Sequence, residues 1–145
     1  MITINPYLDF NGNCEEAFEF YRSVFGGDFP YISRYKEMPQ NPEHPLPEEL
    51  KEKIMHISLP ISQETVLFGS DAVEQFSGKA NFGNNISLMI NAQNKAEVDS
   101  LWAKLSAGGK VTMELMDAFW GDYFGALTDR FGVNWMLICP SEKKD

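Results

Sequence analysis

Acid–base chemistry in this sequence of 145 residues would rest on one histidine and two aspartates. His56 lies in an alternating stretch, IMHISLPI (54–61), on the face that carries the more polar side chains. An imidazole there can act as a general base, bind an anion near neutral pH, or serve as a hydrogen-bonded structural residue. Asp71 ends the next apolar stretch and Asp9 lies on the mixed face of the first, although surface solvation is the common fate of an aspartate. The predicted catalytic residues are His56 and Asp71.

Aromatic and amide side chains supply the candidates for ligand binding. Trp120 and Tyr123 belong to an aromatic run, in which rings beside a cleft can stack on flat ligands or planar cations, or pack in a core. Asn5 and Asn85 lie at matching places in two similar stretches and can hydrogen-bond a ligand or a strand edge. The predicted ligand-binding residues are Asn5, Tyr7, Asp9, Asn85, Trp120 and Tyr123.

The composition excludes several kinds of partner. Twelve basic and 21 acidic residues give a net charge of −9, which disfavours binding to nucleic acids and to anionic membrane surfaces. No run of 18 apolar residues is present, so no membrane span is expected. Two cysteines, Cys14 and Cys139, are too few for a disulfide framework and are expected to be buried thiols. We expect a cytoplasmic protein, because the first ten residues lack a basic leader.

The sequence contains an internal repeat. The stretches FYRSVFGG (20–27) and LWAKLSAGG (101–109) both run from an amphipathic helix into a glycine pair, the usual helix stop. Upstream, Asn13 and Asn94 are N-cap candidates, and each is followed three residues later by a glutamate, as in a capping box. These matched features predict two copies of one structural unit.

Each copy is expected to have the order strand–helix–strand–strand–strand. Alternating strands have one apolar face, which should meet the helices, and one mixed face; two such curved sheets would enclose a cleft suited to function. We therefore predict an α+β fold of two βαβββ modules, with module one at 1–70, a linker at 71–84 and module two at 85–140. Pro6 predicts that the first strand is an edge, which favours a homodimer. The predicted strands are 4–10, 29–38, 54–61, 64–70, 85–91, 110–116, 122–129 and 133–139.

A proline-rich, acidic segment interrupts the first copy at 37–53. It is either a lid over the cleft or a surface excursion. Pro47 at a first helical position predicts one or two helical turns in PEELKEK.

Several of these motifs resemble a known superfamily. The stretches NPYLDFNGNCEEAFEFY, MHISL, VLFGSDA and FWGDYFGALTDRFGVNWML resemble the vicinal oxygen chelate group of glyoxalases, bleomycin-resistance proteins and extradiol dioxygenases. Within it they are most similar to the PhnB-like branch, also known as 3-demethylubiquinone 3-methyltransferase-like. Asp129, Gly132 and Trp135 match its D-x-x-G-x-x-W hairpin. The resemblance implies two paired βαβββ modules, a dimer of a kind that can exchange modules, and, in the enzymes, one divalent metal in the cleft.

The metal positions that the resemblance implies hold no typical ligands. They fall on Asn5, Asn85, Met136 and either Phe68 or Gly69. A hard divalent ion prefers several carboxylate or imidazole ligands, so we expect no metal and no other cofactor. A glycine-rich loop leading from a strand into a helix, typical of S-adenosylmethionine enzymes, is also absent from the sequence.

Three functions are compatible with these features. The first is a bleomycin-resistance-like protein that binds an unidentified small molecule in a metal-free cleft of a dimer. The second is a metal-independent isomerase, lyase or hydrolase that uses His56 with an aspartate, or a methyltransferase as the name of the branch implies. The third is an interaction module whose cleft is filled by side chains.

Overall fold

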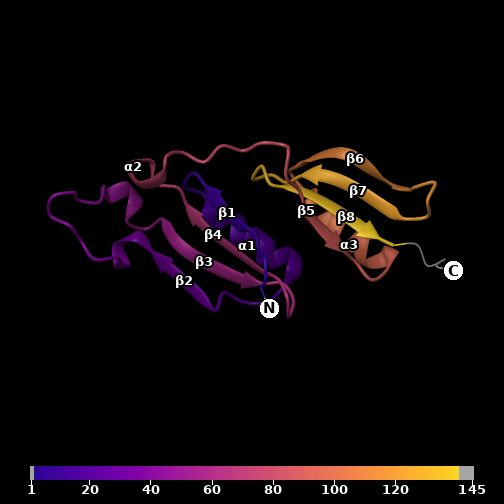
Figure 1. Cartoon of the computed structure of the whole chain (residues 1–145), viewed down its shortest axis with the longest axis horizontal. Coiled ribbons are helices and arrows are strands. Elements are labelled where there is room, and N and C mark those ends of the chain that lie inside the picture. The colour runs from indigo at the N-terminus through magenta and orange to yellow at the C-terminus, as the bar shows by residue number, and fades with distance from the viewer. Residues whose placement is uncertain (1, 141–145) are drawn as a thin grey trace. The chain divides into compact units, whose positions relative to one another are not determined.

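The computed structural model describes residues 2–140 and consists of two compact units that divide between Asn81 and Phe82. Each unit has one four-stranded mixed sheet and one long helix (Figure 1). Among the described helices, none is long and apolar enough to cross a membrane. The units are described separately below as unit 1 and unit 2.

Unit 1 has the sheet order β1-β4-β3-β2. Strands β1 and β4 are parallel, and the other neighbouring pairs are antiparallel. The elements are β1 (Tyr7–Phe10), α1 (Cys14–Phe25), β2 (Tyr31–Arg34), the 3₁₀ turns η1 (Tyr35–Glu37) and η2 (Glu48–Leu50), β3 (Ile54–Pro60), β4 (Val66–Asp71) and the short α2 (Glu74–Ser77).

Unit 2 repeats this topology with the sheet order β5-β8-β7-β6. Its parallel pair is β5 and β8, which corresponds to β1 and β4. The elements are β5 (Leu88–Asn91), α3 (Lys95–Leu105), β6 (Lys110–Asp117), β7 (Tyr123–Thr128) and β8 (Asn134–Cys139). The predicted α+β fold with a duplicated βαβββ order is confirmed, and β1 is a sheet edge as Pro6 predicts.

In both units the helix packs an aromatic ring against a glycine in a central strand. A Cβ added at Gly69 of β4 would collide with the ring of Phe18 from α1. A Cβ added at Gly125 of β7 would lie 2.8 Å from the indole of Trp102 from α3. Because only glycine permits this approach, the two positions identify the face of each sheet that the helix covers.

Of the two predicted asparagine caps, one is confirmed and one is not. Asn94 caps α3 as expected, its Oδ1 accepting from the Glu97 N–H at 2.8 Å. Asn13 forms no side-chain cap on α1. Instead, Asp71 at the end of β4 accepts the N–H groups of Gly12 and Cys14, both at 2.9 Å. An ionised carboxylate is a stronger acceptor than an amide and suits the positive end of a helix, so a residue distant in sequence takes the capping role.

The helix ends are also only partly as predicted. Gly26 has a φ of 82° and its N–H donates to the Arg22 carbonyl, so the first glycine pair does end α1. Helix α3 already ends at Leu105 with Ser106 as its C-cap, and Gly108, with a φ of 75°, follows in the turn to β6. In both units the turn after the helix needs a residue with positive φ.

Several strands are shorter than the alternating pattern predicts. The stretches 4–6 and 85–87 lie outside β1 and β5, and 35–37 is the 3₁₀ turn η1 rather than an extension of β2. The alternation of apolar and polar residues continues past the residues that are paired in the sheet. The alternation alone does not indicate where the neighbouring strand ends. The segment at 71–84, expected to be a linker, contains helix α2 within unit 1.

The motif D-x-x-G-x-x-W folds as a hairpin between β7 and β8. Asp129 Oδ1 accepts the N–H groups of Phe131 and Val133, and its Oδ2 accepts the indole N–H of Trp135 at 2.8 Å. Gly132 has a φ of 93° at the turn. The aspartate is buried, so its carboxylate holds the turn and the tryptophan together.

Candidate functional site

The sheet of unit 1 has a second face that α1 does not cover. Because Gly69 lies beneath Phe18, its neighbours Phe68 and Ser70 point to the opposite side of β4. The strand register places Pro60 and Val66 on this side together with eight residues that we call the helix-distal face of unit 1: Tyr7, Asp9, Tyr31, Ser33, His56, Ser58, Phe68 and Ser70. It brings together three predicted site residues, His56, Tyr7 and Asp9.

Aromatic rings extend across this face from β1 to β2. Tyr7 and Phe68 are paired across β1 and β4, with ring centroids 6.4 Å apart and planes only 18° apart. The imidazole of His56 lies 5.5 Å from both Phe68 and Tyr31, so it fills the space between the rings of the two flanking strands. We call these four residues the aromatic row.

The phenol of Tyr7 and the imidazole of His56 are within hydrogen-bonding distance. The Tyr7 hydroxyl lies 3.3 Å from His56 Nδ1, and the tautomer of the ring decides which group donates. The contact occupies one imidazole nitrogen. The other, Nε2, is left to act on a bound molecule.

A second row on the same face is polar. The Ser70 hydroxyl donates to Asp9 Oδ1 at 2.8 Å. Ser33 is paired with His56 across β2 and β3 and is only 4% exposed, yet its Oγ has no hydrogen-bond partner among the described residues. A buried hydroxyl without a partner is costly, which marks this position as one where a water or a ligand is needed.

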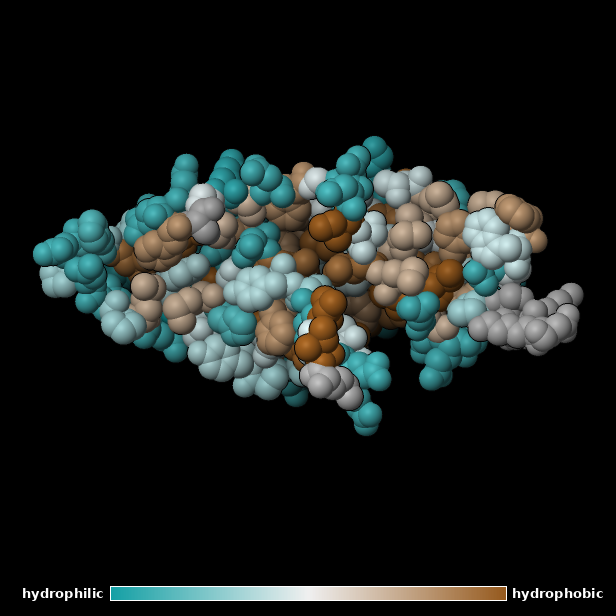
Figure 2. Space-filling view, in the orientation of Figure 1, coloured by the Kyte–Doolittle hydropathy of each residue, from teal (hydrophilic) through white to brown (hydrophobic). Residues whose placement is uncertain are grey.

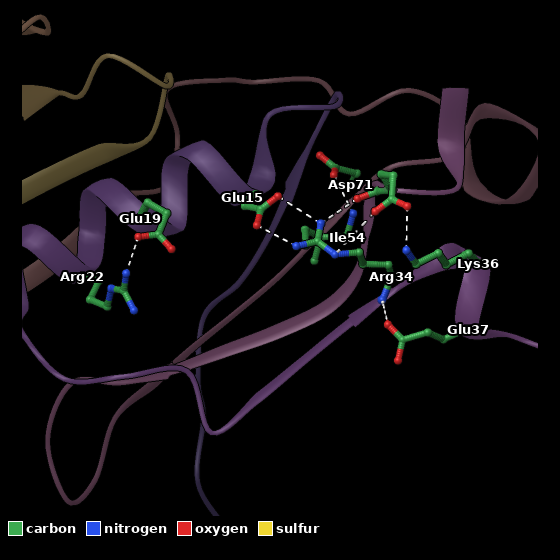
Figure 3. Close-up of polar contacts among 9 residues, drawn as sticks. Glu15, Glu19, Arg22, Arg34, Lys36, Glu37, Ile54 and Asp71 are labelled. Carbon is green, nitrogen blue, oxygen red and sulfur yellow. Dashed lines mark hydrogen bonds and ion pairs between the residues drawn. The ribbon is translucent and has the colours of Figure 1, made fainter. Parts of the chain in front are cut away.

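Asp71, the other predicted catalytic residue, lies on the opposite face of the sheet from His56. It is 2% exposed and its side chain is occupied: besides the two N–H groups at the start of α1, Oδ2 accepts the N–H of Ile54 at 2.9 Å (Figure 3). Its backbone carbonyl accepts the Tyr35 hydroxyl at 2.7 Å. The structure therefore does not bring Asp71 and His56 together; the aspartate that shares a face with His56 is Asp9.

Cys14 is buried at the start of α1. Burial raises the pKa of its thiol far above the ordinary range, and the neighbouring carboxylate of Asp71 adds to the effect. The helix N-terminus therefore does not activate this thiol.

The two predicted asparagines lie outside the strands. Asn5 precedes β1, where its Oδ1 accepts the Val66 N–H at 3.0 Å and its Nδ2 donates to Thr3 at 3.4 Å. Asn5 thereby extends the pairing between β1 and β4 beyond the start of β1. Asn85 precedes β5 and is exposed.

Trp120 and Tyr123 lie near one end of the unit 2 sheet, and both have polar partners. The indole of the half-exposed Trp120 donates to Asp122 Oδ2 at 2.8 Å, and its ring lies 5.5 Å from that of Phe124. Tyr123 donates its hydroxyl to Asp99 of α3 at 2.6 Å, on the side of the sheet that the helix covers. That hydrogen bond, with burial and the charge of the same carboxylate, raises the pKa of Tyr123 to about 12.

The helix-distal face of unit 2 is rich in methionine. The register places Met89, Met136, Met113 and Met116 on the side of the sheet opposite Gly125, together with Phe124. Met89, Met113 and Met116 are about half exposed. Methionine surfaces adapt to apolar partners of different shapes.

The segment between η1 and η2 forms a hollow with α2. Its volume is about 610 Å³, and residues from 38–46 line it together with Gln75 and Phe76. Hydrophilic side chains, teal in Figure 2, cover much of this end of unit 1. None of the eight residues of the helix-distal face lines this hollow.

Several basic side chains of unit 1 are engaged away from the helix-distal face. Arg34 forms an ion pair with Glu15 at 2.7 Å, which lowers the pKa of that glutamate (Figure 3). Lys36 pairs with Glu52 at 2.6 Å. The helix-distal face itself contains one carboxylate, Asp9, and no lysine or arginine.

The family model described as 3-demethylubiquinone-9 3-methyltransferase matches residues 2–138. The chain belongs to this family. It is 32% identical to Protein YjdN of Escherichia coli (strain K12) over an alignment of 140 positions, which covers 92% of each protein.

Solved structures of similar chains agree with this assignment. Protein PA1353 from Pseudomonas aeruginosa is 36% identical, with a TM-score of 0.83 over 98% of this chain and 100% of that chain. A putative 3-demethylubiquinone-9 3-methyltransferase, PhnB protein, from Bacillus cereus is 26% identical, with a TM-score of 0.74 over 95% and 99%. A glyoxalase/bleomycin resistance protein/dioxygenase from Nocardioides shares the fold at 16% identity, with a TM-score of 0.60 over 100% and 86%. The PhnB-like family is thus confirmed, and the chain has the fold of the glyoxalase/bleomycin resistance protein/dioxygenase.

The side chains at the superfamily's metal positions do not fit a metal ion in this family member. Phe68 points to the helix-distal face and Gly69 to the helix, which resolves the alternative at that position in favour of an apolar ring. Met136 is a thioether, and the oxygen of Asn5 already accepts a backbone N–H. Within residues 2–140, no three or more His, Cys, Asp or Glu side chains lie close enough to hold a metal ion.

Sequence reasoning did not select Tyr31, Ser33 or Phe68 as ligand-binding residues. A signal for them exists, because Tyr31 and Ser33 alternate with Ile32 in the same way that Tyr7 and Asp9 alternate with Leu8. Without the register of β2 on β3, however, the alternation does not tell which side the rings share.

Proposed function

We propose that this PhnB-like protein binds a small molecule on the helix-distal face of unit 1, without a metal ion and in the manner of a bleomycin-resistance protein. The observation that carries the proposal is the buried Ser33 hydroxyl without a partner, which lies beside His56 in the aromatic row. A bound molecule would satisfy that hydroxyl and cover the half-exposed rings of Tyr7 and Tyr31. Binding without a metal is supported because the side chains at the superfamily's metal positions are not a suitable set of ligands for a divalent ion.

We also propose that the protein is a homodimer in the cytoplasm. Edge strand β1 and the exposed methionines of unit 2 are features that a second copy would cover. Light scattering should give twice the mass of one chain, and the mass of a single chain would contradict the dimer. The two free cysteines support the proposed location, because the cytoplasm is a reducing compartment.

Native mass spectrometry of freshly purified, untagged protein tests the binding proposal. We expect a non-covalent organic adduct on the wild type that is lost from the double variant Tyr7→Leu/Tyr31→Leu. The matched control is Phe119→Leu, which removes a ring that is 98% exposed and lies outside unit 1. An adduct of equal abundance in the double variant, or no adduct on any protein, would contradict the proposal. Stoichiometric metal in the same samples would contradict binding without a metal.

A second candidate function is metal-independent acid–base catalysis by His56. The contact between Tyr7 and His56 Nδ1 favours it, because it orients the ring and leaves Nε2 as a general base or acid. His56→Ala should then abolish turnover of the retained compound while the melting temperature changes little.

Methyl transfer, which the family's name describes, would require binding of S-adenosylmethionine. Titration calorimetry tests this, and we expect no binding.

A further inference from the structure

We propose that the helix-distal face of unit 1 selects planar, cationic heteroaromatic compounds. This inference rests on the proposed function and adds the chemical class of the ligand. It follows from three properties of the face: its continuous row of partly exposed rings, its single negative charge, and the unsatisfied polar atom beside its aromatic row.

The aromatic row places neighbouring rings across all four strands of the sheet. The planes of Tyr7 and Phe68 differ by 18°, those of Phe68 and His56 by 30° and those of Tyr7 and His56 by 40°, so the ring planes turn gradually across three adjacent strands. Tyr31 is tilted by 60° from His56 at the β2 end of the row. Successive aromatic side chains on a sheet face are a recurrent means of stacking flat rings.

The charge on this face favours a cation. Asp9 is exposed and carries the one formal negative charge, and only Ser70 among the described residues donates a hydrogen bond to it. Nearby cations such as Arg34 are already held by glutamates. The negative faces of the tyrosine rings attract a positive ligand as well, and the eight residues of this face include no lysine or arginine to bind an anion.

The polar atom beside the row favours a heteroatom over a plain hydrocarbon. Ser33 Oγ can donate or accept one hydrogen bond, and the register sets it next to His56. A ring nitrogen or an exocyclic amine in the plane of a stacked ligand can reach an edge of the row while the ring covers the aromatic faces. The site therefore suits a flat molecule with a polar edge.

Titration calorimetry with four probes tests the inference. N-methylquinolinium is planar and cationic, quinoline is planar and neutral, 1-naphthoate is planar and anionic, and tetraethylammonium is cationic but not planar. We expect N-methylquinolinium to bind most tightly. Tyr7→Leu and Tyr31→Leu should each weaken it by roughly tenfold through lost stacking. Asp9→Asn should weaken it several-fold and reduce its dependence on salt. Phe119→Leu and Asp28→Asn, which change an exposed ring and an exposed carboxylate elsewhere, should have no effect.

The outcomes separate this inference from the proposed function. Equal or tighter binding of tetraethylammonium or 1-naphthoate, or unchanged affinity in both tyrosine variants, would overturn the planar cationic class. If the compound retained in native mass spectrometry proves anionic or non-planar but still depends on Tyr7 and Tyr31, the proposed function holds and the class is wrong. If no probe binds and no compound is retained, both are wrong.

Discussion

The Tyr7 hydroxyl and His56 Nδ1 lie 3.3 Å apart, although 49 residues separate them in the sequence. The same imidazole also contacts the rings of Phe68 and Tyr31, so one side chain joins residues from all four strands of the sheet. His56 is thus the centre of the aromatic row, whether it serves only to bind or also to transfer a proton.

Replacing His56 should therefore affect binding more than stability. In His56→Ala we expect the fraction of protein that carries the retained compound to fall about tenfold, because a stacking ring and a hydrogen-bonding nitrogen are lost together. His44→Ala is the control, since that histidine lines the hollow formed by 38–46. Adduct abundance in native mass spectra measures both. A loss in His44→Ala with none in His56→Ala would place the ligand in the hollow instead.

Replacing Asp71 should lower the free energy of unfolding much more than replacing Asp9. Asp71→Asn replaces a buried carboxylate that accepts three backbone N–H groups, and we expect it to lower the free energy of unfolding by about 3 kcal/mol. Asp9→Asn changes an exposed side chain with one hydrogen bond and should cost less than about 1 kcal/mol. Urea denaturation measures both values. Similar losses in the two variants would refute the structural role assigned to Asp71.

The two helix-facing glycines should not tolerate a methyl group. Gly69→Ala would force a Cβ into the Phe18 ring and Gly125→Ala into Trp102, so each should lower the free energy of unfolding by about 1–3 kcal/mol. Gly83→Ala is the control, because a Cβ there would lie an ordinary 3.6 Å from the Asn85 side chain. Thermal and urea unfolding check these values, and wild-type stability in both variants would show that the helices do not pack as described.

Alkaline titration should reveal the bond between Tyr123 and Asp99. The pKa of Tyr123 is raised to about 12, so the stability that this bond contributes is fully present below the ordinary tyrosine pKa of about 10 and is lost as the pH rises through about 12. Ultraviolet titration should show a phenol ionising near 12 that is absent in Tyr123→Phe. Asp99→Asn should return the pKa of Tyr123 toward 10; no change in that variant would exclude the carboxylate as the cause.

The duplicated architecture could be predicted from the sequence because its signals are local. Helix periodicity, the Asn94 cap and the glycine at position 26 each act within a few residues, and Pro6 alone indicates an edge strand. The alternation of Tyr7 with Leu8 likewise predicts which side chains share a face.

The organisation of the candidate site could not be predicted in the same way, because it depends on contacts between distant residues. The role of Asp71 becomes visible only when β4 is seen to end beside the start of α1, 57 residues earlier in the chain. Similarly, the pairing of Ser33 with His56 depends on a strand register that two alternating patterns leave undetermined.

The most direct test of binding on the helix-distal face of unit 1 is a fragment screen followed by backbone-amide NMR spectra of isotope-labelled protein. We predict that fragments shift the amide signals of the strands that carry the aromatic row, β1 to β4, with the largest changes around Tyr7, Tyr31 and His56. Shifts confined to residues 38–46 or to the methionine face of unit 2, with the aromatic row unchanged, would contradict the assignment of this face as the binding surface.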